Sequence, residues 1–256
     1  MHGAVRGQQV EINPPPPLPY PSGRCDFLAP GLPGLTSSAR PSEFRNLGLS
    51  VQGRTIWAEY WGPENPSTTV LVVGQVHGNE CSPSLLVAEI RRNPPDSYGI
   101  WLIPTLNPDG YAAYSRRNAN NADLNADGGK FSQPESRALR DFVNSIRPAL
   151  TVHVHSPNGF VGAHPIGAPL ATSLCSSIGA LPSLRCSSGG AGYRPSRSSW
   201  FLWQGLAALG GESMLIELRA VSNAEVPTAR PRPATTSVEA VRHDAVRILQ
   251  ILEARV

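Results

Sequence analysis

The sequence predicts an α/β protein: a mixed central β-sheet flanked by helices, in a single domain that follows a proline-rich N-terminal tail. From Leu47 onward, short apolar runs alternate with helix-like stretches, which is the pattern of an α/β sheet. Before that point, 9 of the 26 prolines lie within residues 1–41. We therefore divide the chain into an extended tail or wrapping arm, residues 1–46, and one folded domain, residues 47–256.

The tail has the composition of an extended segment, because proline fixes φ and removes a backbone donor. Residues 14–17 are four consecutive prolines. A surface strap or a linker is the simplest interpretation, and a polyproline II ligand for an aromatic groove is the alternative.

Five apolar runs are the expected strands, and they cover residues 55–60, 69–73, 100–105, 150–155 and 214–218. Three helix starts are recognisable: Ser82-Pro83 and two candidate capping boxes, Ser132 to Glu135 and Thr236 to Glu239. In the last helix, five apolar residues share one face and predict packing on the sheet. They are Val238, Val241, Ala245, Ile248 and Leu252.

The composition excludes several classes of protein. Of 256 residues, 40% are hydrophobic and 16% are charged, which fits a folded soluble chain. A net charge of +3 without a basic run gives no indication of nucleic-acid binding. Because the chain has neither a run long enough to insert into a membrane nor a signal-peptide core, we favour a cytoplasmic location. A periplasmic or secreted protein whose leader was removed would look the same.

The four cysteines lack the spacing of a zinc site. Their even number permits disulfides without requiring them, so a bond between Cys175 and Cys186 stays an open question.

A polar turn follows the apolar run that ends at Val73, in the position where open α/β sheets usually bind ligands. It contains His77 and Glu80, which lie three residues apart and can converge on one metal ion. Taken alone, the pair proves little, and a hydrogen-bonded loop histidine is then the better interpretation.

The predicted strand 150–155 offers a third ligand. Strand side chains alternate, so His153 and His155 point to the same face of the sheet. One of them can bind a metal while the other supports it.

Glu217 lies between large apolar neighbours in the strand 214–218. Burial raises the pKa of a glutamate and a nearby cation lowers it, and a base that takes a proton from water needs both influences. An ion pair with Arg219 on the same strand face is the alternative interpretation, and the two are compatible.

A polar region lies between these elements. Residues 107–110, Asn-Pro-Asp-Gly, predict a turn, and residues 116–125 are rich in amide and guanidinium donors. Such donors hold oxyanions or carboxylates, although a solvated loop would have the same composition.

Taken in order, these motifs resemble the M14 family of zinc carboxypeptidases over about residues 47–255. The motifs are Ser-x-x-Gly-Arg-x-Ile at 50–56, His-x-x-Glu at 77–80, Asn-Pro-Asp-Gly at 107–110, Arg-x-Asn at 116–118, Asp-Leu-Asn at 123–125, His-Ser at 155–156 and Glu-Leu-Arg at 217–219. The short chain and the run 116–125 look most like the small bacterial branch typified by murein peptide amidase. That branch cleaves the γ-D-glutamyl-diaminopimelate bond of peptidoglycan peptides.

The resemblance implies a zinc metallocarboxypeptidase or amidase, with a cell-wall peptide as substrate and residues 47–256 as its catalytic domain. It implies one Zn²⁺ ion, whose ligands are His77, Glu80 and His155. It also implies that Glu217 is the general base and acid, that Arg116 stabilises the oxyanion and that Asn125 binds substrate. His153 is expected outside the ligand set.

Two departures from the family pattern concern substrate binding. The family continues Asp-Leu-Asn with an arginine that binds the substrate's terminal carboxylate, whereas this chain has Ala126. Either Asp127 favours a substrate that bears an amine or another arginine takes over, and the candidates are Arg117, Arg194 and Arg197. Tyr193 is the candidate for the tyrosine of the family's mobile loop, and an ordinary surface tyrosine is the alternative.

Two other functions stay open. The tetrad at 77–80, His-Gly-Asn-Glu, also resembles the aspartoacylase and succinylglutamate desuccinylase branch, which hydrolyses N-acyl amino acids. That branch relies on an Asn-Arg pair where this chain has Asn125-Ala126, and the surrounding motifs are more peptidase-like. A non-catalytic peptide-binding module is the alternative of another class. Retention of the three metal ligands and Glu217 argues against it, and the oligomeric state stays open.

Overall fold

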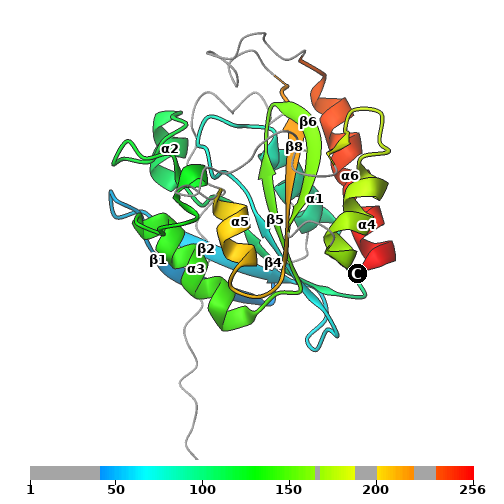
Figure 1. Cartoon of the computed structure of the whole chain (residues 1–256), viewed down its shortest axis with the longest axis horizontal. Helices are drawn as coiled ribbons and strands as arrows, with labels where there is room; N and C mark the ends of the chain where they lie inside the picture. Colours follow the sequence, from blue (N-terminus) through cyan, green and yellow to red (C-terminus); the bar gives the residue numbers. More distant parts are fainter. Residues whose placement is uncertain (1–40, 165–167, 188–200, 222–234) are drawn as a thin grey trace, which may run out of the picture.

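The computed structural model describes residues 41–164, 168–187, 201–221 and 235–256, and an eight-stranded sheet forms their centre (Figure 1). The strands lie in the order β1-β2-β4-β3-β5-β8-β6-β7. Their bounds are β1 Glu43–Leu49, β2 Thr55–Trp61, β3 Thr69–Val73, β4 Gly99–Ile103, β5 Leu150–His155, β6 Asn158–His164, β7 Cys186–Ser187 and β8 Glu212–Arg219. Strands β4, β3, β5 and β8 are parallel, whereas β2 and β6 flank them antiparallel. The predicted α/β class with a mixed sheet is confirmed.

Helices cover both faces of this sheet. They are α1 Pro83–Arg92, α2 Pro108–Ala113, α3 Pro134–Ile146, α4 Pro169–Ile178, α5 Leu202–Ala207 and α6 Val238–Arg255, with a short 3₁₀ helix, η2, at Leu124–Asp127. In Figure 1, α1, α4 and α6 lie on one side of the central strands, and α3 and α5 lie on the other.

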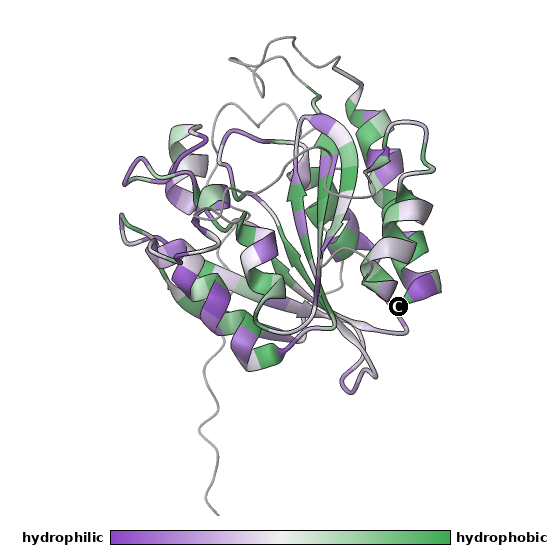
Figure 2. Ribbon diagram, viewed as in Figure 1, coloured by the Kyte–Doolittle hydropathy of each residue, from purple (hydrophilic) through white to green (hydrophobic). Residues whose placement is uncertain are grey.

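The side chains of β3 show how the two faces are filled. Val70 and Val72 pack with residues of α1, α4 and α6, whereas Leu71 and Val73 pack with residues of α3 and α5. Alternation along a strand produces this division, and burial on both faces explains why the parallel strands are short continuous apolar runs. Figure 2 shows the apolar character of these central strands.

The expected strands are observed, with small differences at their ends. The run 100–105 is a strand only to Ile103, and β8 extends beyond the expected range 214–218 at both ends. Strands β1, β6 and β7 were not predicted. Strand β1 begins at Glu43, within the range 1–46 that the sequence assigns to the tail, and residues 1–40 lie outside the described residues.

Both predicted capping boxes are wrong. Helix α3 begins after Gln133, and the hydroxyl of Ser132 donates to Asp127 instead. Helix α6 is capped by Ser237, whose Oγ accepts from the backbone N–H of Ala240 at 3.1 Å. In each helix the observed N-cap lies one residue after the expected one, so the Glu occupies the second helical position instead of the third.

The final helix packs as its periodicity predicts. Val241, Ala245, Ile248 and Leu252 are buried, and Val238 packs against the same apolar cluster. A disulfide between Cys175 and Cys186, with a Cα–Cα distance of 5.2 Å, joins α4 to β7 and answers the question that the sequence left open.

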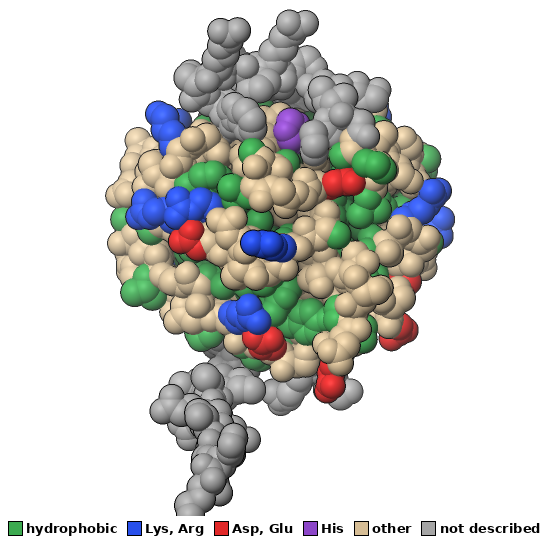
Figure 3. Space-filling view, turned by 60° about the horizontal axis from the view of Figure 1, so that its bottom comes forward, with side chains coloured by type: hydrophobic (Ala, Val, Ile, Leu, Met, Phe, Trp, Pro, Cys, Tyr) green, Lys and Arg blue, Asp and Glu red, His purple; other side chains and the backbone are tan. Residues whose placement is uncertain are grey.

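No helix in the described part of the chain is long and apolar enough to cross a membrane. On the face shown in Figure 3, acidic and basic side chains lie among one another, without a large area of one sign.

Candidate metal centre

The carboxyl ends of β3, β5 and β8 meet at one edge of the sheet, because these strands are parallel. The turn after β3 carries His77 and Glu80, and His155 is the last residue of β5. Glu217 on β8 is in register with His155. The topology therefore brings together four residues from three separate segments of the sequence.

Gly78 fixes the turn that carries His77 and Glu80. A Cβ atom at this position would lie 1.9 Å from the carbonyl carbon of Gly110 and 2.1 Å from the nitrogen of Tyr111. Only glycine permits so close an approach to the backbone of α2. The predicted turn at 107–110 forms the start of this helix, and Asn107 Oδ1 caps it by accepting from the Gly110 N–H at 2.8 Å.

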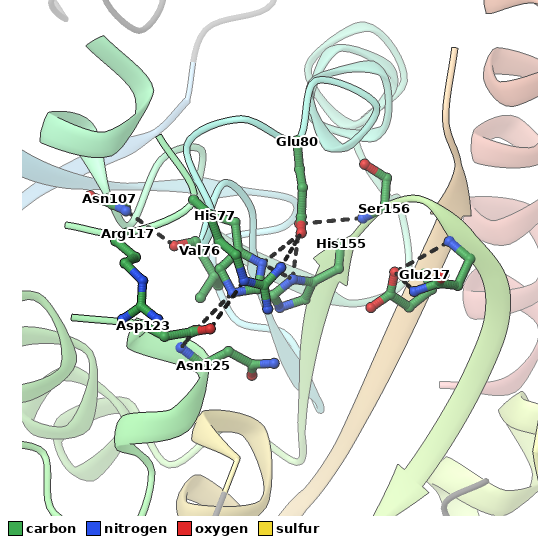
Figure 4. A network of polar contacts seen from close by, with 12 residues as sticks. Val76, His77, Glu80, Asn107, Arg117, Asp123, Asn125, His155, Ser156 and Glu217 are labelled. Carbon is green, nitrogen blue, oxygen red and sulfur yellow. Dashed lines mark hydrogen bonds and ion pairs between the residues drawn. The ribbon is translucent and has the colours of Figure 1, made fainter. Parts of the chain in front are cut away.

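His77, Glu80 and His155 form a compact buried group, here called the His77 cluster (Figure 4). The Nδ1 atom of His77 lies 2.6 Å from Glu80 Oε1 and 3.2 Å from His155 Nδ1, which in turn lies 3.0 Å from Glu80 Oε2. None of the three residues is more than 3% exposed.

The donor set fits zinc. Two imidazole nitrogens and a carboxylate are ligands that Zn²⁺ prefers, and tetrahedral bonds of 2.0 to 2.1 Å separate the ligand atoms by about 3.3 Å. His155 Nδ1 lies near that spacing from both His77 Nδ1 and Glu80 Oε2, at 3.2 and 3.0 Å, and all three ligand atoms lie within 4.8 Å of one another.

The charges of the cluster favour a cation. Burial alone would lower the pKa of His77, but Glu80 and Asp123 outweigh it and raise that pKa to about 9. Burial alone would raise the pKa of Glu80, but the two histidines lower it to about 2. The two carboxylates therefore favour positive charge at this position.

Asp123 and Arg116 border the cluster. The Nε2 atom of His77 lies 3.0 Å from Asp123 Oδ1, and Asp123 Oδ2 accepts from Arg116 Nε at 3.1 Å. A carboxylate behind a metal-binding histidine fixes its tautomer and its ring orientation. The side chain of Arg116 is 51% exposed, and its Nη1 lies 3.6 Å from Glu80 Oε1. Asp123 is not among the site residues predicted from the sequence, although it begins the Asp-Leu-Asn motif at 123–125.

Glu217 lies beside the cluster and is partly buried. Its Oε2 accepts from the backbone N–H and the side-chain amide of Asn158, at 3.4 and 3.3 Å. Burial, with the charge of Glu80 added, raises its pKa. Arg219 donates instead to the Ser183 carbonyl at 3.0 Å, and the described residues form no ion pair between Glu217 and Arg219.

Comparisons with known proteins identify the fold. No model of a protein family matches the chain. A metallo-carboxypeptidase from Burkholderia cenocepacia has a TM-score of 0.66 at 18% identity, covering 93% of this chain and 69% of the other. Murein-tripeptide amidase MpaA from Escherichia coli O157 has a TM-score of 0.59 at 19% identity, covering 83% of this chain and 95% of the other. This chain has the metallo-carboxypeptidase fold.

A curated relative agrees with the fold. Carboxypeptidase SOL1 of Arabidopsis thaliana is 26% identical over an alignment of 184 residues that covers 60% of this chain and 38% of that protein. The chain thus matches about two fifths of that relative's length. These similar proteins are carboxypeptidases and an amidase, which are hydrolases, and the resemblance expected from the motif order is confirmed at the level of the fold.

Within this metallo-carboxypeptidase fold, the residues expected to bind substrate differ in their surroundings. Asn125 is buried in η2, and its Oδ1 has no hydrogen-bond partner among the described residues. Arg117 is exposed and donates to the Asn121 carbonyl at 2.9 Å. Tyr193, Arg194 and Arg197 lie outside the described residues.

Asp127 does not fit the predicted role in substrate binding. Its carboxylate accepts from the hydroxyls of Ser132 and Ser136 and from the backbone N–H of Gln133, so it holds the start of α3. These contacts lower its pKa, although burial acts in the opposite direction. An amine-bearing substrate would have to compete with these donors.

His153 lies outside the His77 cluster, as expected, but no contact among the described residues shows it supporting a ligand. It is fully buried, and neither of its ring nitrogens has a hydrogen-bond partner in the described part of the chain. Burial, followed by the nearby His155, lowers its pKa well below the ordinary value.

Proposed function

We propose that this protein is a zinc-dependent hydrolase of a peptide or amide bond. The observation that carries the proposal is the buried His77 cluster in register with Glu217. His77, Glu80 and His155 would hold one Zn²⁺ ion. When bound, zinc polarises a scissile carbonyl and lowers the pKa of a water molecule.

The residues around the cluster have complementary tasks. Glu217 accepts a proton from the attacking water and returns it to the leaving nitrogen, and a carboxylate with a raised pKa suits both steps. The exposed guanidinium of Arg116 stabilises the negative charge that develops on the carbonyl oxygen. Asp123 orients His77, and Asn125 offers an unpaired carbonyl oxygen to the substrate.

A cell-wall peptide is the substrate that we favour, with cleavage at a γ-D-glutamyl-diaminopimelate bond. Two observations support it: the motif run at 116–125, and a fold similarity that covers 95% of murein-tripeptide amidase MpaA. Ala126 is compatible with a recognition of the substrate terminus that differs from the family's usual arginine fork.

Mass spectrometry of a muropeptide panel tests this proposal. The zinc-loaded protein should release diaminopimelate-containing products, and Glu217→Gln should bind zinc but hydrolyse about a thousandfold more slowly. N-Acetylaspartate in the same panel tests deacylase activity. Cleavage of no muropeptide, or equal cleavage by Glu217→Gln, would overturn the proposal, and less than about one equivalent of tightly bound zinc would favour a non-catalytic binding module.

A further inference from the structure

Glu135 is a fully buried residue that the proposed mechanism does not use. It lies in the first turn of α3. Its Oε1 accepts from the backbone N–H of Val51 at 3.2 Å, and its Oε2 accepts from the side-chain amide of Asn118 at 3.0 Å. Val51 lies in the turn between β1 and β2, whereas Asn118 lies in the loop between α2 and η2. Glu135 therefore connects that turn to that loop.

The turn between β1 and β2 is itself fixed in place. The Ser50 hydroxyl and the backbone N–H of Gln52 donate to the carboxylate of Asp109 in α2, at 2.8 and 2.9 Å. Ser50 and Asp109 are both buried. Helix α3 packs on the sheet through Leu139, Phe142 and Val143. Packed elements thus hold Glu135 on both sides, and its Oε2 atom is the contact that reaches the loop.

Asn118 closes a tight turn within this loop. Its Oδ1 accepts from the backbone N–H groups of Asn120 and Ala122, at 3.1 and 2.9 Å. Its own backbone N–H donates to the Ala122 carbonyl at 3.0 Å, and its side-chain amide also donates to Gln133 Oε1 at 3.0 Å. An asparagine that bonds to the backbone two residues on stabilises a turn. The buried side chain of Asn118 therefore determines the shape of residues 118–122.

The two ends of this turn carry residues of the candidate active site. Arg116 precedes the turn by two residues, and Asp123 follows it directly. The two side chains meet there, with Arg116 Nε donating to Asp123 Oδ2 at 3.1 Å. Asp123 Oδ1 lies 3.0 Å from Nε2 of His77 (Figure 4). The closed turn therefore holds the guanidinium and the carboxylate together beside the His77 cluster.

We propose that Glu135 and Asn118 are positioning residues, which act through the turn 118–122 to place Asp123 behind His77 and Arg116 beside the cluster. Neither of them contacts the three candidate ligands. The inference rests on the proposed function, because that function assigns the zinc ligands and the task of Arg116.

Exchange of the two side chains tests whether they act as a pair. In Asn118→Asp, two carboxylates face each other across the present 3.0 Å contact and repel each other. In Glu135→Gln, a nitrogen replaces one of the two accepting oxygens, so one donor loses its partner. In the double variant Asn118→Asp/Glu135→Gln, the introduced amide can donate to the introduced carboxylate and still accept from Val51.

Zinc affinity measures the positioning without requiring catalysis. Each single variant should bind Zn²⁺ about tenfold more weakly, because the partner of a metal-binding histidine is displaced, and the double variant should bind within about threefold of the wild type. The added negative charge of Asn118→Asp would by itself strengthen the binding of a cation, so a loss in that variant reports the displacement.

Asn120→Asp is the matched control. Asn120 is exposed in the same turn, and its amide donates to the same Gln133 oxygen at 3.0 Å. The variant makes the same chemical change without facing Glu135, and it should bind zinc as the wild type does. If Asn118→Asp does not fold, Asn118→Ser replaces it, because serine keeps a turn-forming oxygen and loses the amide that reaches Glu135.

Hydrolysis measures the part of the inference that concerns Arg116. At saturating zinc, Asn118→Asp should lower kcat about tenfold at unchanged KM, because the guanidinium acts on charge that develops only in the transition state. In an Arg116→Ala background the same substitution should lower kcat no further. A general loss of structure would lower kcat in both backgrounds.

The outcomes separate this inference from the proposed function. Unchanged zinc affinity in the single variants, no recovery in the double variant, or an equal loss in Asn120→Asp would overturn the pairing of Glu135 and Asn118. Loss and recovery of zinc affinity in a protein that cleaves no peptide would support the positioning of Asp123 and overturn the hydrolase function. A fall in kcat that persists without Arg116 would overturn the positioning of Arg116.

Discussion

Two carboxylates in this protein, Glu80 and Asp127, are both buried but have opposite kinds of partner. The Asp127 carboxylate accepts from two hydroxyls and one backbone N–H, all neutral donors supplied by the start of α3. The Glu80 carboxylate faces two imidazole nitrogens that also face each other at 3.2 Å. The first group is complete without a ligand, whereas the second brings three electron-pair donors to one point.

The kind of partner distinguishes a structural carboxylate, Asp127, from a candidate metal ligand, Glu80. Both residues lie in or next to polar sequence motifs, so the motifs alone do not distinguish them. Neutral donors satisfy a carboxylate at any pH at which it is ionised. An imidazole nitrogen interacts favourably with a carboxylate only when that nitrogen carries a proton or when both bind the same metal ion.

Glu80→Gln should lower the affinity for Zn²⁺ by about a thousandfold or more, because a neutral amide replaces the anionic ligand. Competition with a chromophoric chelator measures the affinity directly. Asp127→Asn is the matched control, since it makes the same chemical change in the other carboxylate, and it should bind zinc as the wild type does. Equal losses in both variants would show that the comparison is wrong.

The affinity for zinc should fall as the pH falls. In the metal-free protein the pKa of His77 is raised to about 9, while the pKa of Glu80 is lowered to about 2, so one proton must leave when zinc binds between these values. The apparent affinity should therefore drop about tenfold per pH unit, or about a hundredfold from pH 8 to pH 6. A flat profile over this range would contradict the assignment of the proton to His77.

The same raised pKa sets the stability of the metal-free protein. Protonated His77 stabilises the fold fully below its unfolded pKa of about 6.5, and that contribution is lost as the pH rises toward 9. Urea unfolding of the chelator-treated protein should therefore show decreasing stability between these pH values.

The sequence predicted the central strands of a mixed sheet and named candidate site residues at the ends of three of them. Runs such as 69–73 and 150–155 are apolar because both faces of a parallel strand are buried, and two histidines at the end of such a run are conspicuous. The strands β1 and β6 were missed because neither has the continuous apolar pattern of a strand buried on both faces. Strand β1 is a polar edge strand with exposed residues, and β6 contains Gly159 and Gly162, which a strand pattern does not favour.

The motifs do not predict which polar residues have a structural role and which belong to the candidate site. Asp123 and Asp127 lie four residues apart in the same short segment, yet one contacts His77 and the other holds α3. The contact partners that decide this, Ser136 and His77, lie 9 and 46 residues away along the chain. Only the packing of η2 against α3 and α5 assigns the two roles.

Ala126→Arg should shift substrate preference toward peptides with a free terminal carboxylate by about tenfold, because a guanidinium can bind a carboxylate through two hydrogen bonds. Ala126 is exposed next to Asn125, so the longer side chain has room. The ratio of kcat/KM values for acid and amide forms of one peptide measures the shift. Ala126→Gln, similarly long but uncharged, should leave the ratio as in the wild type, and no shift with arginine would show that this position does not face the substrate terminus.

Asp127→Asn should destabilise the fold by about 1 to 3 kcal/mol, because it weakens several hydrogen bonds to a buried carboxylate, and it should leave substrate preference unchanged. The contacts at α3 lower the pKa of Asp127 below 3.8, so its contribution is present above that pH and is lost as the pH falls through the lower folded value. Urea unfolding of both proteins should therefore show a difference at pH 7 that shrinks below about pH 4. If Asp127→Asn instead altered the preference for amine-bearing peptides at unchanged stability, Asp127 would be the substrate residue that the sequence predicts. Asp127 would then be a ligand-binding carboxylate and not a structural one.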